Sequence, residues 1–227
     1  MKLKIMKNPV IDYQLTIMRD KDTNSQLFRS CLRTVSYYLA GEATKNLKSK
    51  PINIETPICK TVGTKLKTKV VLVPILRAGL GMVDAFREMI PNARIGHIGL
   101  YRDEKTHRPV HYYCKMPKQI KDGTVILLDP MFATGHSASD AVDMIKQYKP
   151  KKIIFVSIVS APEGVKYFTK KHPSIPCITA ALDKKLNKNK YFLGKIKIWP
   201  KPVDTNLSIF RLVLEHAGPT LVGFEGL

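Results

Sequence analysis

The chain has 227 residues, 44% of them hydrophobic and 25% charged, which excludes a disordered, collagen-like or disulfide-rich protein and fits one globular domain with a buried core. The formal net charge of +20 attracts polyanions, whether nucleic acids, anionic membranes or phosphorylated small molecules. Because this excess is mostly lysine, scattered along the chain without interleaved aromatic residues, nucleic acid is not expected as a partner, whereas a phosphate-bearing substrate is compatible with it.

Apolar residues at helical spacing predict an amphipathic helix over 24–43. The elements predicted after it are, in order, strand 70–75, helix 83–89, strand 94–100, strand 110–114, strand 124–128, helix 138–148, strand 152–159, helix 164–171 and strand 177–181. Strands that are apolar on both faces and alternate with helices indicate an α/β protein, with a central, mainly parallel sheet and helices on both faces. Such sheets bind ligands at the carboxyl ends of their strands, so we expect the site in the loops after Val73, Leu100 and Leu128.

The loop after strand 70–75 carries one arginine and two glycines, Arg77, Gly79 and Gly81. Glycines let a backbone approach an anion closely, and a guanidinium can make a forked pair of hydrogen bonds to phosphate oxygens. A tight turn with a solvent-facing arginine explains the same residues equally well.

The loop after strand 124–128 begins with Asp129 and continues through Thr134, Gly135 and Ser137 into a predicted helix. A helix start offers unpaired N–H groups to a phosphate, the hydroxyls can add hydrogen bonds, and a carboxylate at the strand end suits sugar hydroxyls or a metal-bound group. The structural alternative makes a hydroxyl residue a simple N-cap and Asp129 a surface acid. We favour the phosphate-binding interpretation; no Gly-Lys-Ser/Thr follows, so this is not a Walker loop.

The cysteines are widely spaced and form no CxxC pair, which argues against a zinc site; they are Cys31, Cys59, Cys114 and Cys177. Without an apolar secretion signal, reduced thiols and a cytoplasmic location are expected. No apolar run approaches the roughly 20 residues of a membrane-spanning helix, so no membrane association is expected.

At the two loops the chain resembles the uracil phosphoribosyltransferases, a branch of the type I phosphoribosyltransferases. The matching stretches are VPILRAGLGMVDAF (73–86), IGLYRDEKTHRPVHYY (98–113), ILLDPMFATGHSASDAV (126–142) and APEGVKYFTKKHPSI (161–175), with a weaker likeness at IMRDKDT (17–23). The LRAGLG and DPM-ATG pair is specific, because most other phosphoribosyltransferases carry two acids where this chain has Asp129 and Pro130.

The resemblance implies the type I phosphoribosyltransferase fold and a pentosyltransferase of pyrimidine salvage. Such enzymes transfer ribose 5-phosphate from phosphoribosyl pyrophosphate (PRPP) to N1 of uracil, giving UMP and diphosphate. Mg²⁺ accompanies the diphosphate, GTP activates some members, and the family forms dimers or tetramers. The helix over 24–43 is a plausible contact surface for such an oligomer.

The resemblance also implies roles for individual residues. Asp129 would hold the ribose hydroxyls, Arg77 would bind the diphosphate, and Arg102 would close over it with the mobile loop 103–113; Asp129 and Arg102 are the expected catalytic residues. The whole expected PRPP-binding set is Arg77, Arg102, Asp129, Pro130, Met131, Phe132, Ala133, Thr134, Gly135, His136 and Ser137. No metal-ligating side chain and no general base are assigned.

His136 departs from the family, which usually has a second glycine there. Three interpretations stay open: backbone strain, if the position needs a positive φ; an added phosphate donor at acid pH; or a tolerated substitution with the ring in solvent.

The C-terminal part departs further. The expected enzyme domain spans 1–193, where Phe192 is the last aligned position for base binding, and the divergent segment 194–227 lacks the family's PGLGDAGD uracil-binding stretch. Either this tail replaces the base pocket, or it results from a frameshift, or an insertion has moved the pocket to about 214–223. The alternative function is therefore a catalytically impaired or regulatory PRPP-binding homologue, with RNA binding as one form of it.

Overall fold

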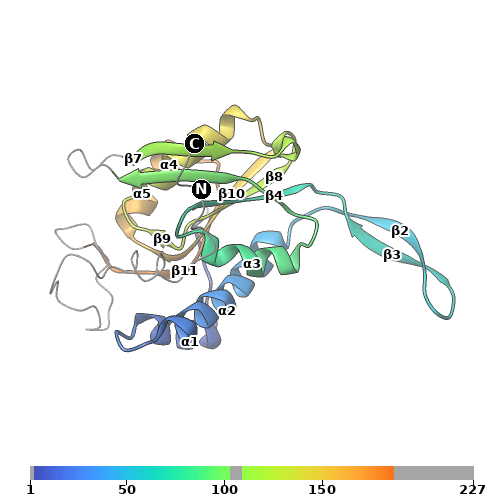
Figure 1. The fold of residues 1–227 in the computed structure, drawn as a ribbon, viewed down its shortest axis with the longest axis horizontal. Coiled ribbons are helices and arrows are strands. Elements are labelled where there is room, and N and C mark those ends of the chain that lie inside the picture. The colour runs from blue at the N-terminus through green and yellow to red at the C-terminus, as the bar shows by residue number, and fades with distance from the viewer. Residues whose placement is uncertain (1–2, 103–108, 187–227) are drawn as a thin grey trace, which may run out of the picture.

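The computed structural model describes residues 3–102 and 109–186, which form a central sheet with helices on both faces (Figure 1). The sheet strands are β1 Leu3–Ile5, β4 Val70–Leu76, β5 Arg94–Ile95, β6 His97–Arg102, β7 Pro109–Lys115, β8 Thr124–Leu128, β9 Met131–Phe132, β10 Lys152–Ser160 and β11 Cys177–Leu182. The helices are α1 Pro9–Arg19, α2 Ser25–Thr44, α3 Leu80–Met89, α4 His136–Gln147 and α5 Pro162–Lys171, with a 3₁₀ turn η1 at Lys118–Ile120.

The main sheet has the order β1-β11-β10-β8-β4-β6-β7, with β5 beside β4 and β9 beside β10. All pairs are parallel except β6 with β7, which run antiparallel at one edge. From β4 the chain moves outward through β6 and β7, then returns to place β8 on the other side of β4. This reversal between β4 and β8 is where a doubly wound sheet opens a crevice for ligands.

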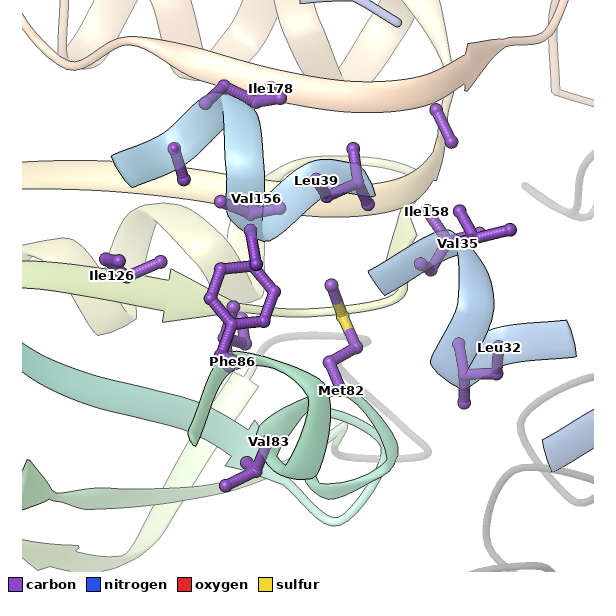
Figure 2. Packing of buried hydrophobic residues seen from close by; sticks show 14 of the residues in the cluster. Leu32, Val35, Leu39, Met82, Val83, Phe86, Ile126, Val156, Ile158 and Ile178 are labelled. Atoms are coloured by element: carbon purple, nitrogen blue, oxygen red, sulfur yellow. The ribbon is translucent and has the colours of Figure 1, made fainter. Parts of the chain in front are cut away.

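Two apolar layers fill the space between the sheet and its helices. Along β4, Leu72 faces α1, α2 and α3, whereas its neighbours Val71 and Val73 face α4 and α5. Figure 2 shows the first layer, where Phe86 and Met82 of α3 meet side chains of α2 and of the strands. Because the inner strands β4, β8 and β10 are buried on both faces, they are almost continuously apolar, as the sequence predicts.

The predicted strands and helices from residue 70 onward are all present, with shifted ends. Helix α3 begins at Leu80 and not at residue 83, and α4 begins at His136 and not at 138. The predicted strand 94–100 is divided into β5 and β6 at Gly96, whose N–H donates to the carbonyl of Leu72 at 2.9 Å. A Cβ at Gly96 would lie 2.6 Å from the Met116 sulfur, so the Met116 side chain packs directly against this glycine.

Apart from the short β9 and η1, the elements that were not predicted are β1, α1, and the hairpin of β2 (Ser49–Glu55) and β3 (Lys60–Leu66). Helix α1 has a clear start signal, since the side chain of Asn8 accepts the Val10 N–H at 2.8 Å and Pro9 follows it. The hairpin projects away from the body (Figure 1), and nearly all its side chains are exposed. It therefore lacks the apolar alternation by which a half-buried strand is recognised.

Helix α2 matches the predicted 24–43 closely, with Asn24 as its N-cap. Its apolar face packs against α1, α3 and the sheet of the same chain, burying Phe28, Leu32 and Leu39. Among the described residues, no helix combines the length and apolarity required to cross a membrane.

Candidate active site

The loops after β4 and β8 lie side by side at the carboxyl edge of the sheet. Pro74 of β4 is in register with Leu128 of β8. A Cβ on Gly79 would lie 2.4 Å from the Leu128 carbonyl oxygen, so only glycine allows the first loop to rest on the end of β8. The Arg77 loop and the Asp129 loop, about 50 residues apart in the sequence, are thus neighbours at the carboxyl ends of β4 and β8, where a doubly wound sheet binds its ligands.

The Asp129 loop leads into α4 through residues 133–137, which we call the cradle. Asp129 donates its N–H to the Val156 carbonyl at 3.1 Å, and its Oδ1 accepts the Met131 N–H at 3.1 Å. Gly135 takes the left-handed conformation with φ 83°, and α4 begins directly after it. The first N–H groups of a twelve-residue helix therefore face the loop, which is the arrangement that binds phosphate.

His136 does not carry the backbone strain considered for it. The positive φ falls on Gly135, and His136 is the first residue of α4. Its Nδ1 lies 3.0 Å from the Thr134 Oγ1, and its ring lies 4.3 Å from the Tyr167 ring of α5. The imidazole is exposed yet held against two neighbours.

The Asp129 carboxyl is only partly accessible, and burial raises its pKa to about 7. The Met131 N–H opposes this shift, and no charged side chain among the described residues contributes to it. A hydrogen-bond donor or a cation beside this carboxyl would stabilise its charged form. A sugar hydroxyl is such a donor, and a metal ion is such a cation.

The start of α5 supports the cradle through backbone contact. A Cβ on Gly164 would lie 2.3 Å from the Ala133 carbonyl oxygen, and one on Gly135 would lie 2.7 Å from the Gly164 carbonyl oxygen. Gly164 was not predicted as a site residue, although it lies in the quoted stretch APEGVKYFTKKHPSI. Its pairing with the cradle depends on a contact across about 30 residues of sequence.

Phe132 of the expected binding set belongs to the core. Its ring lies 4.6 Å from Phe155 and 5.6 Å from Phe168, both edge-on. Pro130 is buried as well, and its carbonyl accepts the Val159 N–H at 3.0 Å. The side chains of Pro130 and Phe132 therefore anchor the loop in the core, so a ligand would contact only the backbone atoms of these two residues.

Arg77 follows a cis Leu76–Arg77 peptide bond, and the residue is exposed directly after the carboxyl end of β4. Arg102 is the last residue of β6, whose register places Gly99 beside Leu76 of β4. Residues 103–108 of the expected mobile loop and Phe192 lie outside the described residues. Within the described ranges, no group of three or more His, Cys, Asp or Glu side chains forms a metal site.

Solved structures share this architecture. A protein from Aquifex aeolicus, AQ2163, superimposes with a TM-score of 0.80 at 30% identity, covering 84% of this chain and 92% of that one. A hypoxanthine-guanine phosphoribosyltransferase from Bacillus anthracis superimposes with a TM-score of 0.51 at 14% identity, covering 70% and 80%. The fold is that of the type I phosphoribosyltransferases, as predicted.

Sequence comparison identifies the branch. Residues 5–196 match the family described as uracil phosphoribosyltransferase. The uracil phosphoribosyltransferase of Malacoplasma penetrans is 53% identical over 189 residues, 83% of this chain and 92% of that protein, and that of Acholeplasma laidlawii is 47% identical over 192 residues, 85% and 92%. The chain belongs to the uracil phosphoribosyltransferase family.

Proposed function

We propose that this chain catalyses the transfer of ribose 5-phosphate from PRPP to N1 of uracil, releasing diphosphate and forming UMP, in pyrimidine salvage. The observation that carries the proposal is the junction of the Arg77 and Asp129 loops, with a helix N-terminus behind a left-handed glycine. The two loops together offer a group for each part of PRPP: the 5-phosphate, the ribose and the diphosphate.

The 5-phosphate lies in the cradle formed by residues 133–137. The N–H groups at the start of α4 point into it, and the hydroxyls of Thr134 and Ser137 belong to the same turn. Asp129, at the end of β8, accepts hydrogen bonds from the ribose hydroxyls. Both groups would fix the sugar so that its anomeric carbon is presented to the base.

The reaction breaks the bond between ribose C1 and the diphosphate, forms the bond to uracil N1 and releases the N1 proton. Positive charge builds on the sugar while negative charge builds on the departing diphosphate. The guanidinium groups of Arg77 and Arg102 stabilise that negative charge, which is largest in the transition state. Closure of the loop after β6 would exclude water that otherwise hydrolyses the activated sugar.

Mg²⁺ fits this site as a companion of the diphosphate. It retains several waters and binds one or two carboxylates together with substrate phosphates, so it requires no cluster of protein ligands. Asp129 is a strand-end carboxyl whose pKa is raised by burial, and a cation beside it would favour its charged form. When bound, the ion would neutralise charge on the diphosphate.

The base pocket is the part of the proposal that depends on the tail. The family match ends at residue 196, and residues 197–227 extend beyond it. A chain that binds PRPP without converting uracil would be the impaired or regulatory homologue.

The decisive test is a radiolabel assay of uracil, PRPP and Mg²⁺ going to UMP, with PRPP binding measured in parallel by calorimetry. We expect UMP formation in the parent chain and a loss of at least about 100-fold in kcat/KM in Asp129→Asn and Arg77→Ala. The exposed Lys166→Ala on α5 is the matched control and should keep full activity. Omission of Mg²⁺ and addition of GTP test the two expected effectors.

Each outcome has a distinct meaning. PRPP binding without UMP would assign the chain to the PRPP-binding alternative, and absence of PRPP binding would refute the proposal. An RNA mobility shift that persists only at low salt would be explained by the net charge alone.

A homo-oligomer is proposed together with the activity, as is a cytoplasmic location. The hairpin supports the oligomer because it exposes apolar side chains far from the core: Ile58 is 93% and Val62 66% exposed. All four cysteines are free thiols, which agrees with a reducing compartment.

A further inference from the structure

His136 occupies a position that the activity proposed above does not explain. Its Nδ1 and the Thr134 Oγ1 are 3.0 Å apart, within the turn that faces the expected 5-phosphate. The ring is also held at 4.3 Å from Tyr167, so its orientation is restrained from α5. The imidazole therefore contacts Thr134, which we place at the phosphate, and packs against Tyr167 of α5.

The direction of the hydrogen bond between these two side chains decides what Thr134 can do. A hydroxyl has one hydrogen to donate. If a bare Nδ1 accepts that hydrogen, the hydroxyl cannot donate it to a phosphate oxygen. If Nδ1 carries the proton and donates to Oγ1, the hydroxyl hydrogen is free to point at the phosphate.

We propose that His136 is a positioning residue for the 5-phosphate: it donates from Nδ1 to Thr134 Oγ1, and this directs the Thr134 hydroxyl hydrogen at the phosphate. The inference rests on the proposed function, since it requires a phosphate in the cradle. Binding of the anion selects the Nδ1-protonated imidazole and polarises the whole chain of hydrogen bonds from His136 to phosphate. Tyr167 keeps the ring in place for this contact.

A double-mutant cycle with ribose 5-phosphate as the ligand tests the proposal without requiring turnover. The variants are His136→Phe, which preserves a ring against Tyr167 but has no donor, and Thr134→Val, which preserves the shape but has no hydroxyl. We expect each single variant to raise the Kd for ribose 5-phosphate about 5–10-fold, and the double variant to match Thr134→Val within about twofold. Thermal unfolding of each variant checks that the fold is retained.

The protonated nitrogen can be observed directly in the parent protein. In ¹⁵N-labelled protein, with the His136 signals assigned by their loss in His136→Phe, ribose 5-phosphate should shift the Nδ1 resonance to that of a protonated nitrogen. A bare Nδ1 in the complex, or losses that multiply in the double variant, would overturn the proposal while leaving the proposed function intact. If the parent chain fails to bind ribose 5-phosphate, both fail together.

Discussion

Asp129 shows at the residue scale how a functional group opposes stability. Its carboxyl ends a strand that is buried on both sides, and desolvation raises its pKa to about 7, against an ordinary value near 4. The folded protein thus binds the proton more tightly than the unfolded chain does. The stability associated with this group is complete below about pH 4 and is lost as the pH rises toward 7.

We therefore expect Asp129→Asn to stabilise the free protein even though it removes activity. Near pH 7.5 the gain in the free energy of unfolding should be about 1–3 kcal/mol, less than the full pKa shift implies because the carboxyl is partly accessible. The gain should shrink steadily from pH 7 to pH 4. Urea denaturation at several pH values measures it, and a constant difference across that range would contradict the pKa assignment.

The same pKa sets the pH dependence of substrate binding. Below about pH 7 Asp129 takes up a proton and accepts hydrogen bonds from ribose hydroxyls less well, so the affinity for PRPP should fall with acidification. A direct titration of PRPP binding between pH 5.5 and 8 should show this decline in the parent chain. The slope attributable to this group should disappear in Asp129→Asn.

At the scale of elements, α5 contacts the loop that we propose as the phosphate cradle. Gly164, in its first turn, touches the backbone of Ala133 and Gly135. At its C-terminal end, the buried His172 lies 2.8 Å from the Ser139 hydroxyl, one turn into α4. Both ends of α5 thus contact the first turn of α4 or the loop before it, which holds that loop in place.

Gly164→Ala should separate α5 from the cradle. The added methyl meets a backbone carbonyl at 2.3 Å, which cannot yield as a side chain would. We expect a stability loss of about 1–3 kcal/mol and a rise in KM for PRPP with a smaller change in kcat. Lys166→Ala, exposed on the same helix, is the control for general effects on α5, and an unchanged KM in Gly164→Ala would show that the cradle does not depend on this contact.

At the scale of the whole molecule, the β2–β3 hairpin is an appendage that the core does not stabilise. Its strands pair along seven residues each, from Ser49 with Leu66 to Glu55 with Lys60, yet it projects from the body (Figure 1). An isolated two-stranded ribbon with exposed apolar side chains is marginal in water. Contact with another copy of the chain would bury Ile54, Ile58 and Val62.

Replacing residues 51–64 by a short glycine linker tests this. The core does not pack on the hairpin, so the melting temperature of the shortened chain should change little at low protein concentration, whereas its mass by light scattering should fall toward that of a protomer. Ile58→Ser with Val62→Ser is the milder version, expected to weaken association without shortening the chain. An unchanged mass in both would remove the hairpin from the oligomer interface.

The sequence by itself determined the layered α/β fold and identified the loops after β4 and β8, in which we propose the site. Buried parallel strands must be apolar on both faces, and the loops at their carboxyl ends carry local signals, Asp129 with Gly135 and Arg77 with Gly79. It did not reveal the hairpin, because exposed strands carry no apolar period, nor β1, whose pairing depends on β11. Helix α1 was missed although Asn8 and Pro9 mark its start.

Only the tertiary structure decided which of those groups meet. The contact of Gly164 with Gly135, the restraint of His136 by Tyr167 and the raised pKa of Asp129 all depend on elements brought together from distant positions. A residue's type sets what it can donate, accept or bury. Its partners and its exposure to water, and so the energy of each interaction, follow from the packing of the folded chain.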